Sequence, residues 1–167
     1  MRGRGRGGRG GGGTRLHPPD PAPTPLPPPP SQVEVKLTGD GPWALPGAPE
    51  VSIHRQTGHT EASTVLHHAP SGTLFTGDVL SFGPDEVWAA TGRLHVHRAF
   101  TWFSMPEQLK SLGALPSTVR PLLHILPGHG RPGSFAGHKE AAAALAELLT
   151  REGDPESAAA ALAGGAE

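Results

Sequence analysis

The chain of 167 residues contains no cysteine. This absence excludes disulfides, iron–sulfur clusters and thiolate zinc sites, so a bound metal would have to be held by His, Asp or Glu. The sequence also lacks the run of about 18 or more apolar residues that a membrane helix needs, and no apolar signal-peptide core follows the first residues. We therefore expect a soluble intracellular protein with no membrane partner, in the cytoplasm or a plastid.

Basic residues are scarce outside the first part of the chain. Residues 1–31 hold five of the 14 Lys and Arg residues and one of the 15 acidic residues, so the remainder carries a net charge of about −5 with His neutral. A folded nucleic-acid binder needs clustered Lys and Arg to neutralise phosphates. The composition therefore argues against a nucleic-acid interface on the folded part.

The first 31 residues differ in composition from the rest. Met1–Gly13 is almost only Arg and Gly, and Pro18–Pro30 is mostly proline. Neither stretch buries enough apolar surface to fold, so residues 1–31 are predicted to form a disordered arm, with the proline run as polyproline II. An Arg-Gly repeat can bind RNA weakly and without sequence preference, and an Arg-rich, acid-poor arm also has features of a transit peptide. Both alternatives stay open.

Short β-rich stretches separated by turn residues predict a sheet in the middle of the chain. The predicted strands are Val33–Leu37, Val51–His54, Ser63–Ala69, Thr73–Phe75 and Leu122–Leu126. The turn Pro70-Ser71-Gly72 predicts a hairpin between the third and fourth of these strands. Trp43–Pro49 and Val79–Thr101 are rich in Gly, Pro and Trp and are predicted to be loops.

Two helices are predicted after these strands. Ser104-Met105-Pro106-Glu107 is a capping box, followed by an apolar stripe of leucines that Pro116 ends. The second helix is predicted from Ser134 to Arg151, because apolar residues repeat there at helical spacing before a glycine and a proline. These elements give an α/β fold class for residues 32–153, followed by a low-complexity tail at 154–167.

Three predicted strands are each followed by a glycine, and a residue able to bind a metal comes directly after that glycine. The three pairs are Gly58-His59, Gly77-Asp78 and Gly128-His129. Glycine permits the sharp turn that exposes the next side chain, and imidazole and carboxylate groups are ligands for divalent ions. The pattern predicts a metal site at strand ends, with His59, Asp78 and His129 as ligands.

The same three turns resemble motifs of the metallo-β-lactamase superfamily. Thr57-Gly58-His59-Thr60, Leu74-Phe75-Thr76-Gly77-Asp78 and Leu126-Pro127-Gly128-His129-Gly130 resemble its glyoxalase II-like hydrolases in order and rough spacing. Trp102-Phe103-Ser104, ahead of the capped helix, is most similar to a plant and algal branch of metallo-hydrolase-like proteins. The resemblance covers about residues 51–149.

The resemblance implies an αββα sandwich and a centre with two metal ions. It implies that His59 ligates one ion, that Asp78 bridges both and is catalytic, and that His129 ligates the second ion. Zinc is the implied metal, with iron or manganese as alternatives. The implied reaction is hydrolysis of a small-molecule ester or thioester by metal-activated water.

One part of the family pattern is missing. Members carry a His-x-His-x-Asp-His motif ahead of the first glycine turn, and no such motif occurs between Met1 and Gln56. His95-Val96-His97 is a candidate substitute, because a two-residue spacing places both rings on one face of a strand. It follows Asp78 instead of preceding it. The chain is therefore predicted to be the truncated second half of the sandwich, with half of its metal site.

Half a sandwich leaves one apolar sheet face unmatched, so association through that face is expected. Two other functions stay open beside the hydrolase. One is a catalytically inactive fold remnant that acts as an interaction module. The other is RNA association through the Arg/Gly arm.

Overall fold

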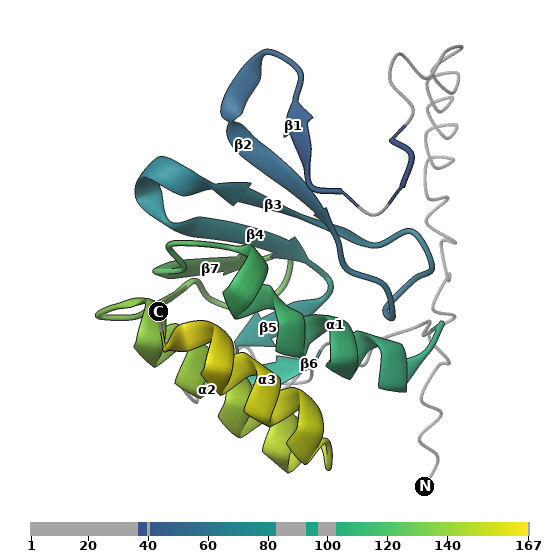
Figure 1. The fold of residues 1–167 in the computed structure, drawn as a ribbon, viewed down its shortest axis with the longest axis vertical. Coiled ribbons are helices and arrows are strands. Elements are labelled where there is room, and N and C mark those ends of the chain that lie inside the picture. Colours follow the sequence, from purple (N-terminus) through teal and green to yellow (C-terminus); the bar gives the residue numbers. More distant parts are fainter. Residues whose placement is uncertain (1–36, 40, 83–92, 97–102, 167) are drawn as a thin grey trace, which may run out of the picture. The chain divides into compact units, whose positions relative to one another are not determined.

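The computed structural model describes residues 37–39, 41–82, 93–96 and 103–166. The predicted arm and nearly all of the strand predicted at 33–37 lie outside these residues. The main sheet has six strands in the order β1-β2-β3-β4-β7-β8 (Figure 1). Their bounds are Trp43–Leu45, Ala48–Arg55, Thr64–His68, Thr73–Gly77, His124–Pro127 and Gly133–Ser134. The β4–β7 pair is parallel and the other pairs in this sheet are antiparallel.

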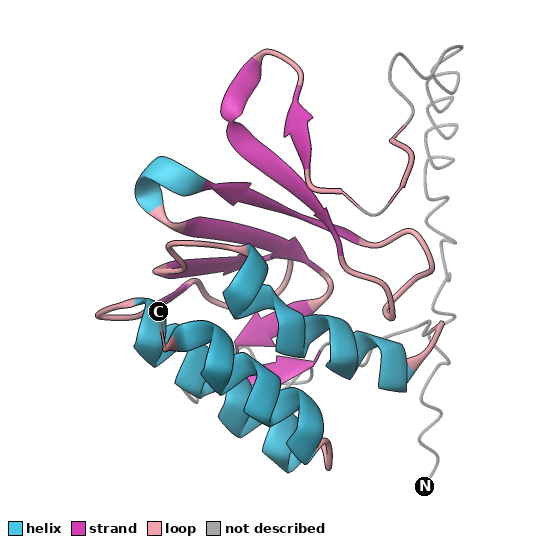
Figure 2. Ribbon diagram, in the orientation of Figure 1, coloured by secondary structure: helices cyan, strands magenta, loops and turns pink. Residues whose placement is uncertain are grey.

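A second, two-stranded sheet and three α-helices complete the described part of the chain (Figure 2). Strands β5 (Leu80–Phe82) and β6 (Leu94–Val96) pair antiparallel. The helices are α1 (Met105–Thr118), α2 (His138–Arg151) and α3 (Pro155–Gly165), and a short 3-10 turn spans Ala69–Ser71. No helix among the described residues is long and apolar enough to cross a membrane. The predicted α/β class is confirmed.

One face of the main sheet packs against the helices. Val65, Leu74 and Ile125 on this face are fully buried. The helices cover them with the predicted leucine stripes, which form one core with the sheet: Leu109, Leu112 and Leu115 from α1, and Leu145, Leu148 and Leu149 from α2. This burial supplies most of the hydrophobic stabilisation of the domain.

The other face of the sheet carries a continuous apolar row. Cross-strand pairing places Trp43, Ile53, Leu66, Phe75 and Leu126 opposite one another over β1, β2, β3, β4 and β7. Phe75, near the middle, is 42% exposed, whereas Ile53 is only 8% exposed. The row lies on the face that the half-sandwich hypothesis leaves unmatched.

Two segments predicted to be loops contain strands. Residues 43–49 form β1 and the start of β2, joined through Gly47 at φ 80°. The loop predicted at 79–101 contains β5 and β6. The first two strands were not predicted because the segment is rich in proline and glycine. These residues are tolerated here because β1 is an edge strand. The pairing of β5 with β6 depends on contacts distant in sequence, which periodicity alone does not reveal.

The helix boundaries partly differ from those predicted. The N-cap of the predicted capping box is confirmed, because the Glu107 amide donates to Ser104 Oγ at 3.4 Å, whereas the Ser104 amide donates to the Gly58 carbonyl. Pro116 does not end α1, which continues to Thr118. Proline removes one backbone hydrogen bond and disturbs the helix around it, and only two residues of α1 follow Pro116. The second helix begins at His138 and not at Ser134, which instead pairs with His124 in β8.

Residues predicted as a low-complexity tail include the ordered helix α3. Asp154 caps this helix by accepting hydrogen bonds from the Ser157 amide at 2.9 Å and the Ser157 hydroxyl at 2.7 Å. These bonds lower the pKa of Asp154. Small residues allow close packing: a Cβ on Gly113 of α1 would lie 2.7 Å from the Ser157 carbonyl oxygen. Alanine-rich composition therefore reflects helix packing here.

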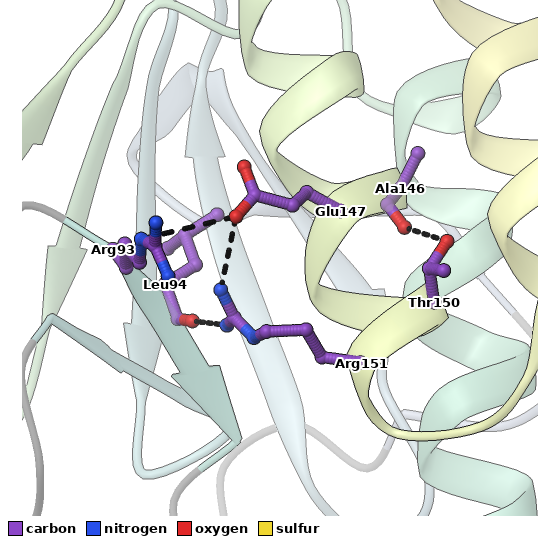
Figure 3. Close-up of polar contacts among 6 residues, drawn as sticks. All are labelled: Arg93, Leu94, Ala146, Glu147, Thr150 and Arg151. Atoms are coloured by element: carbon purple, nitrogen blue, oxygen red, sulfur yellow. Dashed lines mark hydrogen bonds and ion pairs between the residues drawn. The ribbon is translucent and has the colours of Figure 1, made fainter.

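Polar contacts join α2 to the small sheet (Figure 3). The Arg151 guanidinium donates to the Leu94 carbonyl and also lies 3.3 Å from Glu147 Oε1. Arg93 approaches the same carboxylate at 3.9 Å. These partly exposed ion pairs contribute little stability themselves, but the backbone bond fixes the end of α2 beside β6.

Two buried histidines lie on the helix-facing side of the sheet. The rings of His54 and His67 are 6.3 Å apart between centroids. His67 Nε2 lies 2.8 Å from the Pro121 carbonyl, and His54 Nε2 lies 2.8 Å from Ser52 Oγ. Burial lowers the pKa of both rings, and neighbouring histidines lower it further, while the hydrogen bond to the Pro121 carbonyl raises the pKa of His67 and offsets part of the shift. The fold therefore favours their neutral forms.

This preference predicts stability that falls in acid. Because the folded-state pKa lies below the unfolded value of about 6.5, the unfolded chain binds more protons as the pH drops below that value. The contribution of these rings is fully present above pH 6.5 and is lost as the pH falls through the lowered pKa. Urea unfolding of wild type should show lower stability at pH 5 than at pH 7.5. A His67→Gln variant should show a smaller drop, and an equal drop would contradict this account.

Candidate metal centre

The three glycine turns follow strands that end at one edge of the sheet. Strand β2 is antiparallel to β3, and β3 is antiparallel to β4, which is parallel to β7. Strands β2, β4 and β7 therefore run in the same direction, so their carboxyl ends share an edge. His59, Asp78 and His129 all follow that edge, as a site at strand ends requires.

Asp78 and His129 are in direct contact. His129 Nε2 lies 3.3 Å from Asp78 Oδ1, and both side chains are about half exposed. The Gly128 amide donates to the Gly77 carbonyl at 2.8 Å and joins the two turns. A Cβ on Gly128 would lie 2.9 Å from Asp78 Oδ1. Glycine at this position lets the two ligand turns approach each other.

The spacing of this pair fits two ligands of one zinc ion. Bonds of about 2.0–2.1 Å at a tetrahedral angle place neighbouring donor atoms about 3.3–3.4 Å apart. The distance between Asp78 Oδ1 and His129 Nε2 is 3.3 Å. Within the described part of the chain, however, no group of three or more His, Cys, Asp or Glu residues could hold a metal ion. The fit therefore concerns two ligands and not a complete shell.

His59 is held in a separate turn at the same edge and is 8% exposed. Gly58 beside it has φ 136°, and its carbonyl accepts hydrogen bonds from the amides of Phe103 at 3.1 Å and Ser104 at 3.0 Å. The Phe103 amide also lies 3.2 Å from the His59 carbonyl. The start of α1 therefore fixes the backbone of this turn, while β3 separates β2 from β4 in the sheet.

Two polar residues of α1 contact the turns and were not predicted from the sequence. Gln108 is fully buried, and its Nε2 donates to the Val79 carbonyl at 3.0 Å. Ser111 Oγ donates to the Thr57 carbonyl at 2.9 Å and accepts from Gln56 Nε2 at 2.6 Å. One signal was available, because Gln108 lies four residues before Leu112 and therefore on the buried stripe.

The other histidines have structural surroundings. His95 lies opposite Ser81 in the small sheet, and His97 lies outside the described residues, so their proposed role as a substitute ligand pair stays untested. His138 Nδ1 accepts from the Leu122 amide at 3.1 Å. His68 and His124 bond to Ser71 and Ser134. These contacts give His68, His124 and His138 structural partners within the fold.

Gly58→Ala should destabilise the chain far more than Gly47→Ala. Both glycines have positive φ, 136° and 80°, which costs a non-glycine residue about 1–2 kcal/mol. A Cβ at Gly47 meets nothing within 4 Å, whereas one at Gly58 would lie 2.2 Å from Gln108 Cβ. Urea unfolding should therefore give a loss of about 1–2 kcal/mol for Gly47→Ala and a loss exceeding 3 kcal/mol, roughly, for Gly58→Ala. Equal losses would show that the close approach to α1 is unimportant.

Comparison with known proteins finds likenesses among solved structures. No protein-family model and no curated protein matches the chain. Among solved structures, the chain is similar to TMB-1, a metallo-β-lactamase studied for substrate and inhibitor binding, with a TM-score of 0.46 and 18% sequence identity. The match covers 74% of this chain and 50% of TMB-1, so the chain spans about half the length of that protein.

Proposed function

We propose that this chain provides part of the active site of a metal-dependent hydrolase of the metallo-β-lactamase type, in the glyoxalase II-like class that cleaves esters or thioesters. The observation that carries the proposal is the contact between Asp78 and His129, 3.3 Å apart at the ends of adjacent parallel strands. The order of the three glycine-ligand motifs supports it. The match between this distance and the edge of a tetrahedral zinc shell supports it as well.

In this proposal, Asp78 and His129 would hold one metal ion, and Asp78 with His59 would hold a second. Zinc is the first candidate, and iron or manganese would accept the same His and carboxylate ligands. When bound, such an ion supplies a Lewis acid that activates water near neutral pH. Half exposure of Asp78 and His129 leaves both groups open to solvent and to a small substrate.

These three residues are too few for two complete metal shells. Catalytic zinc sites usually have three protein ligands per ion, and the proposed arrangement gives each ion one histidine and a shared carboxylate. We therefore propose that full activity requires further ligands, which the family resemblance assigns to a His-x-His-x-Asp-His segment outside this sequence. The expected activity of this chain by itself is accordingly weak.

A second candidate is an interaction module without catalysis. The apolar row that includes the 42% exposed Phe75 favours it, because exposed apolar surface often marks a contact with another protein. Metal binding separates the two candidates. The hydrolase must bind zinc through Asp78 and His129, whereas the module has no need of a metal.

Asp78→Ala and His129→Ala should each lower the zinc or iron content of the purified chain, because each removes one of two adjacent donors. His124→Ala is the matched control, since His124 lies on the same strand as the residues leading to His129 and bonds to Ser134. Elemental analysis measures the metal content, and hydrolysis of an activated thioester is followed on the same samples. Unchanged metal content in Asp78→Ala and His129→Ala would sink the proposal. So would thioester hydrolysis that survives both metal removal by a chelator and Asp78→Ala.

A further inference from the structure

We propose that Gln108 is a positioning residue that couples the His59 turn to the turn carrying Asp78. This inference rests on the proposed function, because it gives the two turns a common purpose. It concerns one residue of α1 that contacts both turns and is not itself one of the proposed ligands. Three features of Gln108 carry the inference.

First, the His59 turn packs directly against the backbone of Gln108. The position of a Cβ on Gly58 would lie 2.2 Å from Gln108 Cβ, 2.3 Å from its Cα and 2.4 Å from its amide nitrogen. Gly58 itself therefore packs directly on the helix with no side chain between them. A shift of α1 at Gln108 must shift Gly58 and, with it, His59.

Second, the side chain of Gln108 reaches the other turn. Its Nε2 donates to the Val79 carbonyl at 3.0 Å, one residue after Asp78. The Val79 amide donates to the Thr76 carbonyl at 3.1 Å, and the Gly77 carbonyl accepts from the Gly128 amide at 2.8 Å. This series of bonds connects Gln108 to the Asp78 turn and then to the His129 turn.

Third, the amide contributes little to the fold apart from this one bond. Gln108 is fully buried, yet its Oε1 has no hydrogen-bond partner among the described residues. Gln108→Met removes this unpartnered oxygen, but it also leaves the buried Val79 carbonyl without its donor, so the two effects on stability offset each other only in part. Gln108→Met should therefore lower global stability modestly while it disconnects the Asp78 turn from α1.

Ser111 offers a matched control one helical turn further along α1. Its hydroxyl donates to the Thr57 carbonyl at 2.9 Å on the His59 side, and its other carbonyl contact is to Gln108 within α1 at 3.0 Å. Ser111→Ala removes a polar contact from the same helix without affecting the bond to Val79. The two variants therefore separate coupling between the turns from general loosening of α1.

The test compares amide hydrogen exchange in the metal-free full chain for wild type, Gln108→Met and Ser111→Ala. We expect Gln108→Met to raise exchange at least tenfold at residues 77–80, with at most a modest increase in β3 and α2. Ser111→Ala should raise exchange at residues 57–60 and leave residues 77–80 as in wild type. A uniform increase over the whole domain in Gln108→Met, or unchanged exchange at 77–80, would overturn the inference. If Gln108→Met does not fold, Gln108→Leu is measured in its place.

Zinc titration of the same variants links the coupling to the site. Residues that orient metal ligands typically change metal affinity by about 10–100-fold when replaced, so Gln108→Met should weaken zinc binding by about that factor, and Ser111→Ala by less. Equal weakening in both variants would contradict coupling through Gln108. If wild type binds no zinc at all, the proposed function fails, and the exchange experiment still decides whether Gln108 couples the turns.

Discussion

The parallel pairing of β4 with β7 is the constraint on which the proposed site depends. These strands are separated by more than forty residues in the sequence, yet their register places Gly77 opposite Pro127. The glycine turns after them then meet, with Gly128 donating to Gly77 and His129 reaching Asp78. Parallel strands need a long crossover connection, and here that connection contains β5, β6 and α1. Helix α1 is thus part of the connection that permits the pairing and also contacts the turns.

Helix α1 has two roles, one carried by its apolar side chains and the other by its polar side chains. Its leucines enter the core shared with the sheet and α2, and this burial fixes the position of the helix. From this fixed helix, the polar side chains of Gln108 and Ser111 donate hydrogen bonds to backbone carbonyls in the turns after β4 and β2. Packing against the helix reduces the freedom of the turns, and in the proposed site this restriction would favour metal binding.

Features governed by local sequence could be predicted, and features governed by distant contacts could not. The glycine turns, the hairpin of β3 with β4 and the Ser104 cap follow from residue patterns within a few positions, and all are present. The edge strand β1 was missed because Pro and Gly obscure its alternation. Helix α3 was missed because an alanine-rich segment gains its stability from packing on α1, as the contact between Gly113 and Ser157 illustrates. The candidate ligands were identified from sequence, whereas Gln108 became visible only once α1 was placed against both turns.

The central claim is that the ends of β2, β4 and β7 together bind a divalent metal. Paramagnetic NMR of the full chain with substoichiometric Co²⁺ or Mn²⁺ tests it most directly, because such ions broaden the signals of nearby amides. The account predicts selective broadening at residues 58–60, 77–79 and 128–130. Broadening confined to other histidines, such as His68 and His124, or no selective broadening at all, would contradict it.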